Sequence, residues 1–222
     1  MFKLRLLPEV LLAATLVLAS AGAARADGTP DPLNDFIPSF TGVHNADLDV
    51  LSAFVTYNPV TDIFFLSGTM AGAIGTTVSS LYVWGFDRGA GTARFGPIAT
   101  GVLFDSVVTA TGTGVGQVTL LSPAPSVTTP LAAGSVSFSG NTITVSVSGA
   151  LLLPNGVPRT AFTWNLWPRD TTQAGTAAIS DFAPDNSNVA VAVVPEPSSM
   201  ALLALGLGAL GWVTSRRRSA PV

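Results

Sequence analysis

His44 is the only histidine of the 222-residue chain, and it stands in the stretch TGVHNADLDV, close to Asp47 and Asp49. A Ser-His-Asp relay needs a histidine beside a buried carboxylate and an activated serine. The G-x-S-x-G turn that exposes such a serine in many hydrolases does not occur in the sequence. We therefore predict that His44 is a solvated loop residue.

Carboxylates are the second group that could do chemistry. Glycoside hydrolysis needs two of them at a defined separation, with the pKa of one raised. Residues 27–194 contain eleven aspartates and no glutamate, and most of these aspartates stand at expected turns or strand ends, where Asp often bonds to its own backbone. The sequence therefore predicts a protein that is not an enzyme.

A cation is the third option. The stretch SDFAPDNSNVA brings four oxygen-bearing side chains close together in the sequence: Asp181, Asp185, Asn186 and Asn188. Such oxygens suit a hard cation such as Ca²⁺, but the regular D-x-[DN]-x-[DN]-G loop is missing. We treat these four residues as a weak candidate for a structural Ca²⁺ site, with Asx turns as the alternative, and expect no other cofactor.

Aromatic residues could bind sugar rings. In LYVWGF and FTWNLW the aromatic positions alternate along expected strands, which is more typical of a core than of a ligand platform. Trp167 leaves that alternation and is followed by Arg169 and Asp170. We predict an exposed corner in which Trp167 and Arg169 would be the contacts of a carbohydrate ligand.

The elements that must position these residues are strands. Short runs of alternating apolar and polar residues are separated by turns rich in Gly, Pro and Asn, and residues 136–148 are the clearest case. No convincing amphipathic helix interrupts them. The pattern predicts an all-β, antiparallel sandwich or jelly-roll-like domain over residues 46–194, preceded by an irregular lead rich in Pro and Asp over residues 27–45.

Composition limits the function classes. Only 10% of the residues are charged, and residues 27–194 carry four arginines against eleven aspartates, 4 − 11 = −7. A nucleic-acid-binding surface would need a basic patch, so this class is excluded. The chain has no cysteine, so disulfides and thiolate metal sites are excluded as well.

The N-terminal 26 residues have the layout of a secretory signal peptide. Lys3 and Arg5 form a basic head, residues 10–19 are apolar, and Ala24-Arg25-Ala26 is a small-residue cleavage box. We expect a signal-peptide helix that the secretion machinery and signal peptidase recognise and that is cut before Asp27. An uncleaved N-terminal anchor is the alternative.

The C-terminal segment has a second layout. Pro195-Glu196-Pro197 precedes an uncharged apolar stretch over residues 198–215, and Arg216, Arg217 and Arg218 follow directly. Eighteen helical residues span about 27 Å, nearly the thickness of a hydrocarbon core, and the arginines would stay in the cytoplasm. We expect a transmembrane helix here.

This order of tripeptide, span and arginines resembles the PEP-CTERM sorting signal of Gram-negative bacteria over residues 193–222. The resemblance implies that a membrane-embedded exosortase recognises the tripeptide and cuts near it, and that the chain is anchored in the inner membrane only for a time. We therefore expect an exported component of the cell envelope or extracellular matrix, in contact with exopolysaccharide. The alternative function is a module that binds exopolysaccharide.

Overall fold

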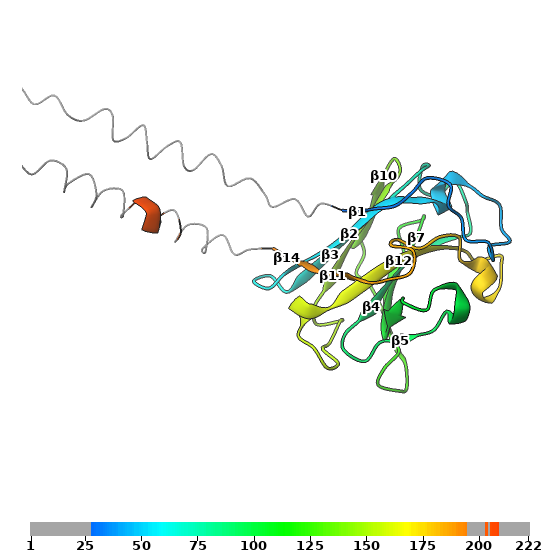
Figure 1. Cartoon of the computed structure of the whole chain (residues 1–222). Coiled ribbons are helices and arrows are strands. Elements are labelled where there is room, and N and C mark those ends of the chain that lie inside the picture. Colours follow the sequence, from blue (N-terminus) through cyan, green and yellow to red (C-terminus); the bar gives the residue numbers. More distant parts are fainter. Residues whose placement is uncertain (1–27, 195–202, 204, 209–222) are drawn as a thin grey trace, which may run out of the picture. The chain divides into compact units, whose positions relative to one another are not determined.

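The structure is a computed structural model that describes residues 28–194, 203 and 205–208. Residues Ala26–Val194 form one compact unit. The compact unit, called the domain below, consists of strands, turns and four 3₁₀ turns: η2 (Ala46–Leu48), η3 (Gly96–Ile98), η4 (Arg159–Ala161) and η5 (Gly175–Ala178). Figure 1 shows the domain with its strands labelled.

The first sheet has six strands in the order β1-β2-β3-β11-β10, with β14 also paired to β2. Their bounds are β1 (Thr29–Pro30), β2 (Val50–Asn58), β3 (Ile63–Met70), β10 (Val136–Ser139), β11 (Thr142–Ser148) and β14 (Ala192–Val193). All pairs are antiparallel except β14 with β2. The β2–β3 hairpin turns over Asn58 to Asp62 and the β10–β11 hairpin at Gly140-Asn141, and Asp62 and Gly140 adopt positive φ in these turns.

The second sheet has the order β13-β12-β4-β7-β8-β9 and is antiparallel throughout. Its strands are β4 (Ser80–Asp87), β7 (Ser106–Thr111), β8 (Gly116–Leu120), β9 (Val127–Pro130), β12 (Thr163–Asp170) and β13 (Val189–Ala190). A separate two-stranded sheet joins β5 (Thr92–Ala93) to β6 (Leu103–Phe104).

One hydrophobic core joins the two six-stranded sheets. Phe64 of β3 packs edge-on against Phe86 of β4, with ring centroids 5.8 Å apart, and stacks on Phe162. The predicted aromatic row of Tyr82, Trp84 and Phe86 is fully buried in this core. The two-residue period of the strands therefore sorts the side chains, with apolar residues of both sheets buried in this core.

A second, smaller cluster lies on the other face of the second sheet. It contains Val83 and Trp167 from the strands, and Ala99, Val102, Phe104, Ile179 and Phe182 from the segments that cross over them. These loops, which the sequence left unassigned, cover an apolar patch on β4 and β12. Their packing decides the environment of Trp167.

Strands are the main regular structure of the described residues and all but one of their pairings are antiparallel, so the predicted all-β class is confirmed. The sequence reading missed β9, where the Thr-rich run before Pro130 has little apolar alternation. The largely apolar stretch over residues 101–111 is not one strand, because the structure divides it into β6 and β7 at Asp105. The backbone N–H of Asp105 bonds to Phe86 O across that break.

Candidate functional site

The last strand of the domain connects it to the C-terminal segment. Ala192 and Val193 pair in parallel with Thr56 and Tyr57 of β2, and the Val194 N–H donates to Tyr57 O at 2.9 Å. The backbone is therefore held in the sheet up to the residue before Pro195. Proline has no N–H to continue such pairing.

The first strand of the domain lies on the same edge of β2. Thr29 pairs with Ala53 in the antiparallel sense, whereas Ala192 pairs with Thr56. Three residues along a strand correspond to about 10 Å. The chain therefore enters and leaves the domain along the same edge of β2, opposite Ala53 at its start and opposite Tyr57 at its end.

A polar network stabilises that end of β2. The Tyr57 hydroxyl donates to Asp62 Oδ1 at 2.8 Å, and Arg159 lies 3.6 Å from the same oxygen. Arg159 also donates to Gly149 O. Burial, followed by the neighbouring Asp62, raises the pKa of the Tyr57 hydroxyl. The hairpin and the loop before η4 are thereby fixed next to β14.

Three carboxylates meet where the N-terminal lead packs on the domain. Asp31, Asp35 and Asp181 each place an oxygen within 4.8 Å of the others. Burial, with added repulsion from Asp181, raises the pKa of Asp31 to about 9, and burial raises the pKa of Asp181 to about 7. Asp181 also accepts hydrogen bonds from the Val50 and Phe182 N–H groups.

This acidic cluster can do two things. Its oxygens are the hard donors that Ca²⁺ prefers. Without a cation the carboxyls must share protons, because like charges this close cannot all ionise. Asp31 Oδ2 and Asp35 Oδ1 are buried and have no hydrogen-bond partner. Both options use the same residues.

The predicted Ca²⁺ residues are divided between two places. Asp181 is buried in the acidic cluster, and the charge of Asp185 contributes to the raised pKa of Asp31. Asn186 Oδ1 instead accepts from the Gly101 N–H at 2.7 Å, and the Asn188 amide bonds to both backbone groups of Leu103. Asn186 and Asn188 are therefore backbone caps for the segment before β6. In the acidic cluster, Asp181 is joined by Asp31 and Asp35 in place of Asn186 and Asn188. Asp31 and Asp35 lie more than 140 residues away from Asp181 in sequence.

Trp167 is not an exposed ligand contact, so that prediction is wrong. Its side chain is only 2% exposed and packs against Phe95, Phe104 and Phe182. Gly85 makes this possible, because a Cβ there would overlap the indole ring. The sequence correctly placed Trp167 on the face opposite the main core, but loops cover that face.

Arg169 is half-buried beside this cluster. It donates to Gly175 O at 3.1 Å, its Nε has no partner, and burial lowers the pKa of its guanidinium. Its neighbour Asp170 is buried and accepts from Ser79 and Thr172. The predicted Trp167–Arg169 corner is therefore a packed loop anchor.

Arg88 is the charged residue whose role the sequence reading missed. Although glycines follow it in the sequence, Arg88 is 1% exposed and forms an ion pair with Asp105 at 2.8 Å. It also donates to Leu153 O at 2.6 Å and to Ser122 O. With only four arginines in residues 27–194, each one was a candidate for such a structural role.

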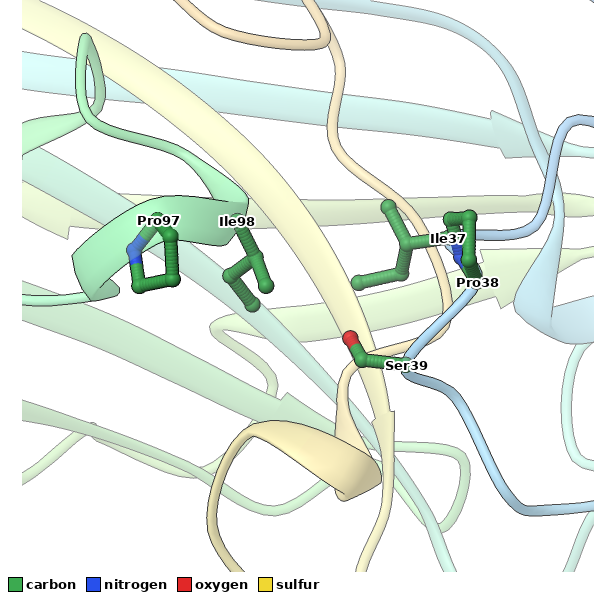
Figure 2. A pocket seen from close by; sticks show the side chains of 5 residues that line it. All are labelled: Ile37, Pro38, Ser39, Pro97 and Ile98. Carbon is green, nitrogen blue, oxygen red and sulfur yellow. The ribbon is translucent and has the colours of Figure 1, made fainter.

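The surroundings of His44 and of one hollow in the domain can be described directly. His44 is exposed and stacks on Phe36, with ring centroids 4.3 Å apart. The hollow lies between residues 37–39 and 97–98, as Figure 2 shows, and its only side-chain polar atom is the Ser39 hydroxyl. A hydroxyl without a neighbouring base is not an activated nucleophile.

Comparison with known families decides the identity of the C-terminal segment. Residues 193–218 match the PEP-CTERM protein-sorting motif. The chain therefore carries a PEP-CTERM sorting motif in its C-terminal segment. The matched range includes all the residues predicted for sorting at this end: Pro195, Glu196, Pro197, Arg216, Arg217 and Arg218. No curated protein and no solved structure matches the chain.

The PEP-CTERM motif makes this an exported protein with a C-terminal sorting signal and implies an exosortase as its processing partner. The motif begins inside the domain, since Val193 belongs to β14. The remaining sorting residues, together with Ala24 and Ala26 of the signal-peptide prediction, lie outside the described residues.

The expected membrane span is described only at residues 203 and 205–208, which are helical. Within the described part of the chain, no helix is long and apolar enough to cross a membrane. The span over residues 198–215 therefore remains a prediction from the sequence.

Proposed function

We propose that the PEP-CTERM protein is exported by its signal peptide, held for a time in the inner membrane by residues 198–215, and then cut by exosortase near Pro195-Glu196-Pro197. The product is a non-catalytic β-sandwich domain of the cell envelope or extracellular matrix. The match of residues 193–218 to the sorting motif carries this proposal.

The sandwich interpretation is supported by the shared core. Phe64 of the first sheet contacts Phe86 of the second, and both are fully buried. Two sheets that share one hydrophobic layer in this way bury the inward half of their side chains. A small, cysteine-free exported domain depends on such a core for its stability.

The geometry of the domain supports two-ended processing. The chain enters at Thr29 and leaves at Val194 along the same edge of β2. Neither end passes through the core, so both terminal segments can be removed without breaking a central strand pair. If exosortase needs β14 to leave the sheet before it cuts, only the two-residue pairing of β14 with β2 is lost.

Pulse-chase labelling in a host with the exosortase gene tests the proposal. The full chain, tagged at both ends, should lose both tags, and Glu196→Ala or deletion of the exosortase should leave the C-terminal tag in place. Ser198→Ala is the matched control, since it lies beside the tripeptide but outside it. A C-terminal tag that persists in the parent chain would contradict the proposal.

The absence of catalysis is tested separately. A screen of the purified chain against ester and glycoside substrates should show no turnover, because His44 lies on the surface and stacks on Phe36. Turnover that a His44→Ala variant abolishes would show that the protein is an enzyme.

A further inference from the structure

The outward face of the first sheet has an unusual composition. It consists of the even-numbered residues 52–58 of β2 and 142–148 of β11, and the odd-numbered residues 63–69 of β3 and 137–139 of β10. We call this surface the hydroxyl face. Ten of its fourteen side chains are Ser or Thr, one is Asn, three are apolar, and none carries a charge.

The strand register arranges these side chains as a grid. Ser52, Thr69 and Thr142 stand side by side across three strands, and Thr69 and Thr142 hydroxyls lie 3.2 Å apart. In the next row Thr144 and Ser137 hydroxyls lie 2.8 Å apart. Neighbouring rows on one face are about 7 Å apart along the strands, and neighbouring columns about 5 Å. The hydroxyls therefore form a regular array on one surface.

Aromatic rings lie within this array. Phe54 and Phe65 contact each other across β2 and β3 with ring centroids 5.9 Å apart, and Phe65 is 39% exposed. Ser146 pairs with Phe65 from the other side and is exposed. Phe54 is half-buried, whereas Phe65 and Ile63 are exposed, so this face presents one accessible aromatic ring and one aliphatic side chain among its hydroxyls.

The two sheets differ in how the domain treats their outward faces. On the second sheet, Val83 and Trp167 are covered by loops that contribute Phe104 and Phe182. On the first sheet, Ile63 is 40% exposed and the Ser residues at positions 137, 139, 146 and 148 are exposed, whereas Ser67 in the middle of the face is only 4% exposed. The described residues therefore leave most, but not all, of the hydroxyl face open.

We propose that the hydroxyl face binds a neutral polysaccharide chain. Sugar rings present C–H groups that pack on aromatic faces, and hydroxyls that both donate and accept, as Ser and Thr hydroxyls do. An uncharged face matches an uncharged polymer, because it offers no cation to pair with an acidic sugar. This inference goes beyond the sorting function and does not depend on exosortase processing.

A second copy of the chain suits the face less well. The centres of protein–protein interfaces are enriched in aromatic residues, Met and Arg, and depleted in Ser. Here ten hydroxyls surround three apolar side chains. A surface with this many hydroxyl groups can instead exchange its hydrogen bonds with water for hydrogen bonds with a polyhydroxylated ligand.

Binding of the full chain in phosphatidylcholine nanodiscs to three polymers tests the inference: insoluble β-1,4-glucan, soluble dextran, and the anionic polymer alginate. We expect binding to at least one neutral polymer, with little change between about 50 mM and about 500 mM salt, because no charges are paired. Phe65→Ala should weaken this binding at least about fivefold, as the loss of a central contact does.

Ser146→Asp introduces a charge beside Phe65 and should weaken binding to a similar degree. The matched control is Ser126→Asp, which lies in an exposed loop of the second sheet and should bind as the parent does. Unchanged near-ultraviolet circular dichroism shows that the variants are folded. The inference is overturned if the parent binds neither neutral polymer, prefers alginate, or binds equally well with Phe65→Ala and Ser146→Asp. It is also overturned if Phe65→Ala converts a dimeric parent to a monomer.

Discussion

The buried ion pair of Arg88 and Asp105 gives the sharpest prediction on stability. Arg88→Met keeps most of the side-chain volume but removes the guanidinium, which donates to Asp105 Oδ1 at 2.8 Å and to Leu153 O at 2.6 Å. Asp105, itself 0% exposed, would retain only the Arg88 N–H and the Asn155 amide as donors. A buried charge would be left without its counterion.

Removing one partner of a buried pair typically costs 3–5 kcal/mol. Because the Arg88 N–H and the Asn155 amide still solvate Asp105, we expect the lower end, about 3 kcal/mol in the free energy of unfolding. That is a large part of the 5–15 kcal/mol typical of a domain. With a denaturant slope of about 2 kcal/mol per M, the urea midpoint should fall by about 1.5 M.

The measurement is urea unfolding of the full chain in non-ionic detergent, followed by near-ultraviolet circular dichroism. Arg94→Met is the matched control: Arg94 is exposed, donates to Phe104 O at 3.3 Å and lies over the Phe104 ring, so it should cost at most about 1 kcal/mol. In Arg88→Met/Asp105→Leu the uncompensated charge is gone, so part of the loss should be recovered. A loss below about 1 kcal/mol for Arg88→Met, or strict additivity in the double variant, would refute this reasoning.

The acidic cluster predicts a pH dependence. In the unfolded chain its carboxyls lose their protons near pH 3.8, whereas in the folded domain the raised pKa values keep some of them protonated. The free energy of unfolding should therefore fall as the pH rises from about 4 towards about 9. The slope should be at most about 1.4 kcal/mol per pH unit for each proton that the folded domain retains. In Asp31→Asn this pH dependence should be weaker, which is measured as a smaller difference between the urea midpoints at about pH 5 and about pH 8. An equally large difference in the variant would show that other groups titrate. Trp167→Ala should lower stability by about 3–5 kcal/mol, as expected for a buried Trp, without changing binding to neutral polysaccharide at constant folded protein. Selective loss of binding in a folded Trp167→Ala protein would instead restore Trp167 as a ligand contact.

Much of the fold could be predicted because strand residues alternate. The period of two placed Tyr82, Trp84 and Phe86 on one face and Trp167 on the opposite face, and the structure agrees on both. β9 escaped because its Thr and Pro residues carry no apolar signal. The alternation of apolar and polar residues is sufficient to predict a strand and its buried face where the polarity of each side chain decides which way it points.

The residues of the candidate site were harder to predict. Asp181 was recognised, but Asp31 and Asp35 come from the N-terminal lead, and nothing in their local sequence indicates that the lead packs beside residue 181. Arg88 and Asp105 are separated by 17 residues and meet only because β4 and β7 pair. Such contacts depend on the path of the whole chain.

The sequence by itself determined the all-β class and the C-terminal sorting signal, because strand alternation and a linear recognition motif are written in neighbouring residues. Only the tertiary structure decided which faces are covered: loops bury Trp167, whereas Phe65 on the hydroxyl face stays exposed. The physical reason is that burial depends on what packs over a side chain. For the faces of a sheet, that covering comes from segments distant in the sequence.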